Sequence, residues 1–379
     1  MKVAIVHEWF VNYAGSEKVV EEILKVFPQA DLFALVDFLP DDERGFLGGR
    51  RAHTSFIQRL PKARSAFRNY LPLMPLAVEQ FDLSAYDLVI SSNHAVAKGV
   101  ITGPGQMHVS YVHTPIRYAW DLQHQYLRES GLQKGLKAWI ARLTLHYLRI
   151  WDSRTAHGVD AFLANSKYIA RRIRKTYGRD SKVVYPPVDV ARFAMRRDKE
   201  NFYLAASRMV PYKRMPMIVE AFAAMPKRQL VVIGDGPELE RVKALAHDVS
   251  NVTILGYQTT EVLADYMARA RAFVFAAEED FGITPVEAQA CGTPVIAYGA
   301  GGVLETVISS DDPDKRTGLF FRNQTVDAVC NAVHEFEVAG EFRPEVCRAN
   351  AERFSVENFR QGLRQAVGQL FVIPGGTEQ

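Results

Sequence analysis

The stretch that decides the fold lies at residues 272–288, where a short apolar run passes through a polar loop into a helix. It opens with Ala-Phe-Val-Phe at 272–275 and continues as Glu-Asp-Phe-Gly-Ile-Thr-Pro-Val-Glu-Ala at 279–288. The first run has the length and composition of a buried strand. Pro285 suits the first turn of a helix, and Thr284 is expected to cap it. Strand, loop and helix in this order predict one βα unit of a parallel sheet.

The same unit recurs along almost the whole chain, because short apolar runs alternate with amphipathic helical stretches. These runs lie at 3–7, 31–36, 87–91, 109–112, 161–164, 183–185, 202–206, 230–233, 252–255, 272–275, 294–297 and 319–321. Most are apolar on both faces, as in parallel sheets covered by helices on both sides. The sequence therefore predicts doubly wound α/β folds, with ligands at the carboxyl ends of the strands.

Length and proline content divide the chain in two. A chain of 379 residues is too long for one ordinary core, and Pro186-Pro187 ends a strand and forbids a helix. We expect an N-terminal lobe at 1–187, a C-terminal lobe at 200–354, and a final helix at 355–371 that packs back on the N-terminal lobe. Pro-Gly-Gly at 374–376 is expected to be disordered.

Composition points to a soluble cytoplasmic protein. Apolar residues make up 48% of the chain and charged residues 23%, as in soluble globular proteins. The cysteines number three and are widely spaced, which favours neither a disulfide framework nor a metal site. The first apolar run is too short for a signal peptide or a membrane span.

Positive charge is concentrated in the first half. Residues 1–190 hold 25 Lys and Arg against 18 Asp and Glu. A basic segment with interleaved apolar residues carries Arg59, Lys62, Arg64 and Arg68. It predicts contact with an anionic membrane surface or a phosphorylated lipid, and a solvated face of a helical insertion is the alternative. Nucleic acid is excluded as a partner, because the basic excess is modest and no recognition motif is present.

Two cations and two carboxylates are the strongest candidates for a binding site. Arg208 and Lys213 follow the strand at 202–206, where they can neutralise a diphosphate. Glu279 and Glu287 flank the start of a helix, where the amides of Phe281, Gly282 and Ile283 favour an anion. One carboxylate can bind a ribose diol and the other sugar hydroxyls. The alternative is a pair of exposed acids near a helix start.

The first half offers two weaker candidates. Gly15 ends the loop after the first strand and precedes a helix, so its amide can face a phosphate; alternatively Ser16 is a plain N-cap. His113 follows the strand at 109–112, where a ligand is expected, although a lone histidine is more often structural. Asp312-Pro313-Asp314 has cationic neighbours and no preceding strand, so we interpret it as a surface turn. We predict no metal and no cofactor.

These candidates together resemble a known family. His113-Thr114-Pro115, Arg208 with Lys213, and Glu279 with Glu287 occur in this order in retaining family 4 glycosyltransferases of the GT-B fold. Residues 113–121 are similar to bacterial O-antigen and exopolysaccharide mannosyltransferases. The resemblance implies two Rossmann-like doubly wound lobes with an interdomain cleft, acceptor on the N-terminal side and nucleotide sugar on the other. One departure is Ala14-Gly15, where the family usually has two consecutive glycines.

The same resemblance implies a role for each candidate. Glu287 holds the ribose, and Arg208 with Lys213 stabilises the departing diphosphate, which the Gly15 amide approaches. Glu279 and the amides of 281–283 hold the donor sugar. His113 contacts the sugar near the reacting carbon. The nucleotide base is expected near Gly256 and Tyr257.

The implied reaction is metal-independent transfer, with retained configuration, of a hexose to a hydroxyl group. The favoured donor is GDP-mannose, and the favoured acceptor is a lipid-diphosphate-linked glycan in polysaccharide, lipopolysaccharide or O-antigen biosynthesis. The enzyme is then cytoplasmic, with peripheral attachment to the inner face of the cytoplasmic membrane. A UDP-hexose or UDP-N-acetylhexosamine transferase, a nucleotide-sugar epimerase and a non-catalytic glycan-binding scaffold remain alternatives.

Overall fold

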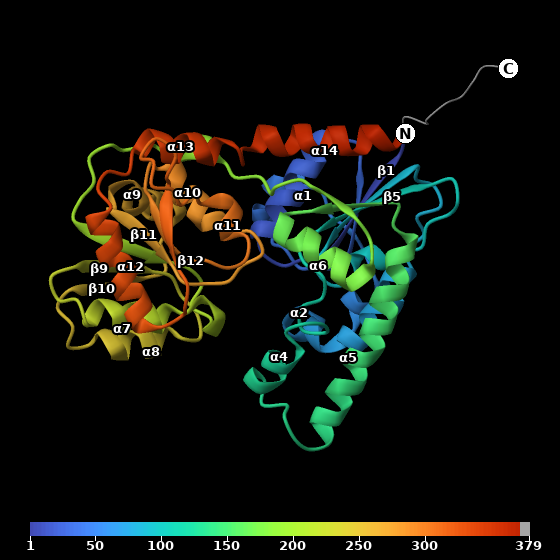
Figure 1. Cartoon of the computed structure of the whole chain (residues 1–379). Helices are drawn as coiled ribbons and strands as arrows, with labels where there is room; N and C mark the ends of the chain where they lie inside the picture. Colours follow the sequence, from blue (N-terminus) through green and yellow to red (C-terminus); the bar gives the residue numbers. More distant parts are fainter. Residues whose placement is uncertain (372–379) are drawn as a thin grey trace. The chain divides into compact units, whose positions relative to one another are not determined.

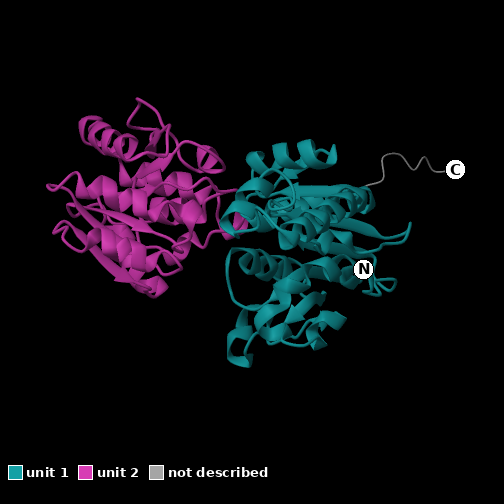
Figure 2. Cartoon of the chain, turned by 90° about the horizontal axis from the view of Figure 1, so that it is seen from below, with its two compact units in different colours: residues 1–185, 359–379 teal, residues 186–358 magenta. Residues whose placement is uncertain are grey.

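The computed structural model describes residues 1–371, and the segment at 374–376 that was expected to be disordered lies outside the described residues. The chain divides into two compact units. Unit 1 comprises Met1–Tyr185 and Phe359–Gln379, and unit 2 comprises Pro186–Asn358 (Figure 2). Each unit contains its own parallel sheet and its own core.

Unit 1 is built on a seven-stranded parallel sheet with strand order β3-β2-β1-β4-β5-β6-β7 (Figure 1). Its strands are β1 (Val3–Phe10), β2 (Asp31–Asp37), β3 (His53–Thr54), β4 (Leu88–Asn93), β5 (Met107–Val112), β6 (Ala161–Ala164) and β7 (Ser181–Val183). Sequence patterns missed β3, which has two exposed residues and therefore no apolar signal. The strand expected at 183–185 is displaced to 181–183. As an edge strand β7 begins on the polar residues Ser181 and Lys182.

Helices cover both faces of this sheet. They are α1 (Gly15–Val26), α2 (Ala63–Ala66), α3 (Met74–Glu79), α4 (Gln123–Glu129), α5 (Leu136–Thr155), α6 (Lys167–Tyr177) and α14 (Val356–Phe371). Along β1, Val3 and Ile5 join the core on one side, and Ala4 and Val6 join the core on the other. This alternation follows from the two-residue period of a strand.

The last helix of the chain belongs to the core of unit 1. Phe359, Leu363 and Val367 of α14 are buried in the cluster that contains Ile5 and Ile23. Their spacing of four residues places them on one face of the helix. Helix α14, which follows unit 2 along the chain, is thus held in unit 1 by apolar packing.

Unit 2 is built on a six-stranded parallel sheet with order β10-β9-β8-β11-β12-β13. The strands are β8 (Phe202–Ala206), β9 (Gln229–Ile233), β10 (Val252–Gly256), β11 (Ala272–Phe275), β12 (Val295–Tyr298) and β13 (Gly318–Phe321). The helices are α7 (Met215–Ala223), α8 (Leu239–Ala246), α9 (Thr260–Arg269), α10 (Ile283–Ala290), α11 (Val303–Thr306), α12 (Val326–Val338) and α13 (Pro344–Glu352). The prediction of two doubly wound, Rossmann-like parallel sheets is confirmed.

Both sheets reverse their strand order at one point. The reversal lies between β1 and β4 in unit 1 and between β8 and β11 in unit 2. At such a point the loops leave neighbouring strands in opposite directions and open a crevice at the carboxyl edge. A ligand is therefore expected at that edge in each unit. None of the helices within residues 1–371 is both long enough and apolar enough to cross a bilayer.

Candidate functional site

In unit 2, two of the predicted residues meet at the reversal point. Lys213 ends a short 3-10 turn (Pro211–Lys213) after β8, and Glu279 lies in the loop after β11. The Lys213 ammonium forms an ion pair with the Glu279 carboxylate, and only 13% and 18% of these side chains are exposed. A partly desolvated cation and anion thus lie where a doubly wound fold binds its ligand.

Arg208 adds a second cation to the same edge. It follows β8 directly and is exposed. Within residues 1–371 its guanidinium has no hydrogen bond or ion pair to another side chain. A guanidinium group without such partners can donate two parallel N–H hydrogen bonds to phosphate oxygens.

The loop after β11 passes into α10 through Gly282. This residue has a φ of 85° and is the N-cap of the helix, without a side-chain cap hydrogen bond. The prediction of Thr284 as N-cap is wrong, because the left-handed turn at Gly282 already places Thr284 in the first helical turn. The first amides of a helix have no intrahelical acceptor, and the binding of an anion by the amides of Phe281, Gly282 and Ile283 stays a prediction. Glu287 lies one turn further along the same helix face as Ile283.

The position of Glu279 is fixed by two contacts of its loop. The Phe281 ring is buried and lies edge-on to Phe354, with ring centroids 5.3 Å apart. The carbonyl of Glu279 accepts a hydrogen bond of 2.7 Å from the amide of Gly302. A Cβ atom at Gly302 would lie 2.4 Å from the Asp280 carbonyl oxygen, so this close approach requires glycine. Sequence reasoning missed Gly302; the signal was the run Gly-Ala-Gly-Gly at 299–302 after a strand.

Gly256 is the last residue of β10, the edge strand of unit 2, and Tyr257 follows it. Strand β9 separates β10 from β8, so the two residues share the carboxyl edge with Lys213 but do not adjoin it. The Tyr257 ring is 75% exposed. A flat, exposed aromatic ring can stack on a nucleotide base, and this role stays a prediction.

In unit 1, His113 follows β5 and is tied to β4 and β1 through one hydroxyl group. His113 Nε2 lies 2.8 Å from Ser92 Oγ, and Ser92 Oγ lies 3.1 Å from His7 Nδ1. Burial, followed by the neighbouring His94 and His7, lowers the pKa of His113 to about 3. The His113 imidazole is therefore neutral near pH 7.

The surroundings of His113 leave one of its ring nitrogens for a substrate. Both ring nitrogens of His7 face an acceptor, because the main-chain oxygen of Ser92 lies 3.3 Å from Nδ1 and Glu17 Oε1 lies 3.3 Å from Nε2. Ser92 Oγ lies within hydrogen-bond distance of both His7 Nδ1 and His113 Nε2. Nε2 of His113 is therefore engaged, and Nδ1 is the ring nitrogen left for a substrate.

Beside these residues lies a buried carboxylate that sequence reasoning missed. Glu8, at the end of β1, accepts four backbone N–H groups from residues 94–97 at 2.8–3.1 Å. Its second oxygen lies 2.9 Å from His94 Nδ1. Burial opposes ionisation of both groups, but their attraction outweighs it, so the pKa of Glu8 is lowered and that of His94 is raised. The available signal was His7-Glu8, a polar pair that interrupts an apolar strand.

Gly15 is the first residue of α1, and Ala14 is its N-cap. The alternative of Ser16 as N-cap is therefore wrong. Glu17 accepts hydrogen bonds from the Ala14 amide at 3.1 Å and from Ser16 Oγ at 2.9 Å, and Glu17 lies 3.3 Å from His7 Nε2. An internal carboxylate thus already lies at this helix start. The approach of the Gly15 amide to a phosphate stays a prediction.

The four cations of the predicted basic segment, Arg59, Lys62, Arg64 and Arg68, are all exposed. The Arg68 guanidinium also lies 5.5 Å from the centre of the Trp9 ring, and Arg68 is one of the charges that acts on His94. Arg68 therefore lies at the carboxyl end of β1, next to the histidine cluster formed by His7, His94 and His113.

The Asp-Pro-Asp segment at 312–314 is engaged with cations. Asp312 forms an ion pair with Lys315 at 3.1 Å, and Asp314 forms one with Arg343. Within the described part of the chain, no group of three or more His, Cys, Asp or Glu side chains is arranged to hold a metal ion.

Comparison with known proteins identifies the family. The family described as "Glycosyltransferase Family 4" matches residues 13–192, and that described as "Glycosyl transferases group 1" matches residues 189–353. The chain belongs to the family 4 glycosyltransferases. Together the two matched segments include His94 and His113 of unit 1 and the Lys213–Glu279 pair of unit 2, whereas His7 and Glu8 precede the first matched residue.

Several curated proteins resemble this glycosyltransferase. A GDP-mannose-dependent alpha-(1-6)-phosphatidylinositol monomannoside mannosyltransferase of Mycobacterium tuberculosis is 32% identical over 211 residues, 48% of this chain and 54% of the relative. A D-inositol 3-phosphate glycosyltransferase of Mycobacteroides abscessus is 29% identical over 214 residues, 50% of this chain and 47% of the relative. The chain spans about half the length of the curated relatives it matches.

Solved structures show the same fold over nearly the whole chain. Sucrose-phosphate synthase of Thermosynechococcus elongatus matches with a TM-score of 0.73 and 19% identity, covering 98% of this chain and 99% of the other. Anabaena HepE in complex with UDP matches with a TM-score of 0.68 and 16% identity, covering 97% of this chain and 100% of the other. At these identities the likeness concerns the fold.

Proposed function

We propose that this protein transfers a hexose from a nucleotide diphosphate sugar to a hydroxyl group. The observation that carries the proposal is the Lys213–Glu279 ion pair at the strand-order reversal of unit 2. A diphosphate competes with Glu279 for Lys213, and a sugar hydroxyl replaces Lys213 as partner of Glu279. The Lys213–Glu279 pair thus holds the two charges that the donor is expected to separate.

The donor is placed by the residues around this pair. Arg208 and Lys213 bind the diphosphate, and the amides of Gly282 and Ile283 at the start of α10 add the helix dipole. Glu287 accepts hydrogen bonds from the ribose, and Glu279 does so from the sugar. The base lies against Gly256 and Tyr257.

In the reaction, the acceptor oxygen forms a bond to the anomeric carbon on the face from which the diphosphate leaves. The bond between that carbon and the phosphate oxygen breaks, and its electron pair goes to the diphosphate, which also takes the acceptor proton. Configuration is retained, and Arg208 and Lys213 stabilise the charge that develops. His113 contacts the sugar through Nδ1, the ring nitrogen that Ser92 leaves available. No protein nucleophile is required.

GDP-mannose is the favoured donor, supported by relatives whose names describe GDP-mannose-dependent mannosyltransferases. UDP-hexose is the second candidate, favoured by structural neighbours that hold UDP or UDP-glucose. A thermal-shift panel of GDP, UDP, ADP and their sugars decides between them. We expect GDP compounds to raise the melting temperature selectively, and selective stabilisation by UDP compounds would replace mannose in this proposal.

The acceptor is a hydroxyl of a lipid-linked glycan at the inner face of the cytoplasmic membrane. Relatives named for phosphatidylinositol monomannoside act on lipid-anchored sugars, and the exposed cations Arg59, Lys62 and Arg64 suit an anionic surface. A lipid diphosphate carrier in polysaccharide or O-antigen assembly fits this description. Radiolabelled donor incubated with lipid extract should label the lipid fraction, and conversion of the donor without any acceptor would indicate an epimerase instead.

Catalysis is proposed to proceed without a metal ion, since two fixed cations supply the positive charge at the diphosphate. Turnover should be unchanged in excess EDTA. Loss of turnover that manganese restores would overturn this part of the proposal.

A further inference from the structure

Helix α5 presents a continuous apolar stripe to solvent. Leu136 is 75% exposed and Trp139 62% exposed, although both side chains are large and apolar. The exposed apolar residues of the stripe are Leu136, Trp139, Ile140, Leu143, Tyr147 and Ile150. Because they recur mainly at spacings of three and four residues, they lie on one side of the helix.

The stripe lies on a different face of α5 from the one that packs against the rest of unit 1. Leu145 and Leu148 join a core cluster with Ile116 and Leu127. On the same packed side, the Asp152 carboxylate forms a fully buried ion pair with Lys98 at 2.7 Å. The helix therefore has a packed inner face and a second apolar face that no element within residues 1–371 covers. Contiguous exposed apolar surface of this kind marks an interaction site.

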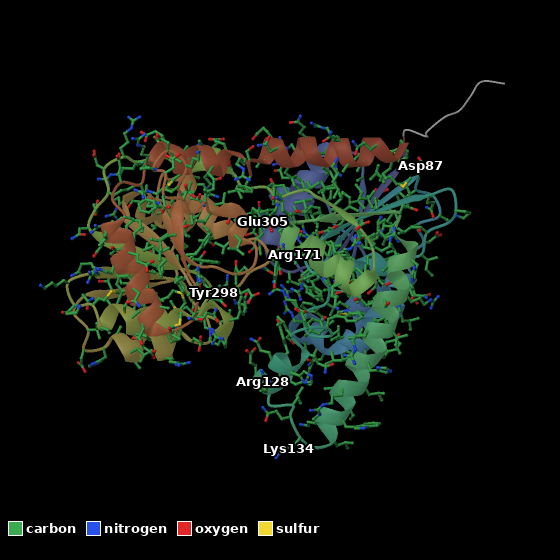
Figure 3. All side chains as sticks on the ribbon, in the orientation of Figure 1. Asp87, Arg128, Lys134, Arg171, Tyr298 and Glu305 are labelled. Carbon is green, nitrogen blue, oxygen red and sulfur yellow. The ribbon has the colours of Figure 1, made fainter. Side chains whose placement is uncertain are left out.

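The charged residues of the segment between Glu129 and Asp152 all have one sign. No Asp or Glu occurs in this segment, whereas Lys134, Lys137 and Arg142 do, and all three are exposed. Figure 3 shows Arg128 on α4 and Lys134 on the connection between α4 and α5, and Figure 1 shows this connection projecting beyond the sheet of unit 1.

We propose that the α5 stripe docks unit 1 on an anionic lipid bilayer. Trp139 and Tyr147 enter the headgroup region with the aliphatic side chains, and the flanking cations bind lipid phosphates. A second copy of the chain fits less well. In a two-fold symmetric contact the same surface meets itself, so these cations would face one another, with no acid in the segment to pair them.

Docking through α5 deepens the proposed function, because it rests on a lipid-linked acceptor and names the surface that reaches the bilayer. In this proposal α5 supplies the apolar area that enters the bilayer, and the basic segment contributes only positive charge. Within that segment, Arg68 lies over Trp9 near the histidine cluster.

The test is co-sedimentation of the full chain with vesicles of phosphatidylcholine containing about 30% phosphatidylglycerol, and with phosphatidylcholine alone. The stripe variant carries Leu136→Ser, Trp139→Ser and Leu143→Ser. The matched control carries three equally exposed apolar changes elsewhere, Leu76→Ser, Ile101→Ser and Val338→Ser. Two cation variants complete the set: Lys134→Ala with Lys137→Ala and Arg142→Ala, and Arg59→Ala with Lys62→Ala and Arg64→Ala.

We expect the stripe variant to lose at least about tenfold in partition coefficient, and the control to bind like the wild type. The α5 cation variant should lose about tenfold on anionic vesicles only. Wild-type binding by the stripe variant, or loss of binding only in the 59–64 variant, would overturn the proposal. A third result would also overturn it: the wild type forms a dimer in sedimentation velocity, the stripe variant does not, and the wild type does not bind vesicles. Because GDP should raise the melting temperature of every variant equally, failure of docking is distinguishable from failure of the donor site.

Discussion

At the scale of single residues, the most informative group is His113, because its surroundings fix its charge and leave one ring nitrogen for a substrate. A pKa lowered to about 3 keeps it neutral, and the Ser92 hydroxyl occupies Nε2. Nδ1 is then the ring nitrogen left for a substrate. An asparagine side chain places its amide near the position of Nδ1, whereas glutamine places it near that of Nε2.

His113→Asn should therefore retain more activity than His113→Gln. We expect kcat to fall by about 10²–10³ in His113→Gln, as for loss of one preorganised donor, and by clearly less in His113→Asn. Steady-state kinetics measures the difference, and unchanged affinity for GDP, which lacks the sugar, is the control. Equal kcat values for the two variants would contradict the contact of His113 with the sugar through Nδ1.

Much of this residue-level account was open to sequence reasoning, but not all of it. His113, Arg208, Lys213 and Glu279 were predicted because charged or titratable residues follow apolar strands. Glu8 was missed, since its role depends on four amides supplied by residues 94–97, and such a long-range contact leaves no local pattern. The exposed stripe of α5 was missed because apolar helical spacing normally indicates a core face.

At the scale of elements, the loop after β11 keeps its shape through its contact with the glycines after β12. Gly302→Ala places a Cβ 2.4 Å from the Asp280 carbonyl oxygen, and this clash displaces the loop that carries Glu279. We expect a loss of donor affinity of about tenfold or more, because such contacts must be held within about 0.5 Å. Calorimetric titration measures it. Gly158→Ala, where nothing lies within 4 Å, is the control and should bind the donor like the wild type.

The buried histidine of the β4–β5 pair, His108, is expected to make the stability of the fold depend on pH. His108 of β5 is fully buried beside Ser91 Oγ at 2.9 Å, and burial lowers its pKa to about 4. The unfolded chain therefore binds a proton between about pH 6.5 and 4 that the folded chain excludes. Stability present above pH 6.5 is lost as the pH falls, by up to about 1.4 kcal/mol per pH unit for this group. His94, whose pKa is raised, contributes fully below pH 6.5 and does not offset this loss.

Denaturant unfolding from about pH 7.5 to 4.5 checks this expectation. His108→Gln should lower stability at neutral pH but make the decline below about pH 6.5 shallower. His113, with its lowered pKa, continues to contribute in the variant. Parallel pH profiles of wild type and His108→Gln would show that His108 does not titrate in this way.

At the scale of the whole molecule, each unit contains its own core, and α14 ties the end of the described chain to unit 1. The alternation of strands and helices was enough to predict both sheets, because buried parallel strands are apolar on both faces. The order of the strands was not predictable from these patterns, since any of them fits several positions in a sheet. The edge strand β3 was missed for another reason: both of its residues are exposed, so it has no apolar pattern in the sequence.

Leu363→Ala tests the contribution of α14 to unit 1. Leu363 is fully buried, so we expect a loss of about 2–5 kcal/mol in unfolding free energy. Gly368→Ala lies on the same helix with nothing within 4 Å, and it should instead add up to about 1 kcal/mol through helix propensity. Denaturant unfolding measures both. A loss below about 1 kcal/mol for Leu363→Ala would mean that α14 packs loosely.

The account depends most on the Lys213–Glu279 pair as the place where the donor binds. Calorimetric titration of GDP and GDP-mannose into wild type, Lys213→Ala and Glu279→Gln tests it directly, with Lys227→Ala, an exposed cation of the same unit, as control. Lys213→Ala should weaken GDP by about 10- to 150-fold, the range for a charged hydrogen bond. Glu279→Gln should weaken GDP-mannose but leave GDP as tight or tighter, since Lys213 is released from its ion pair. Wild-type affinity for GDP in Lys213→Ala would contradict the account.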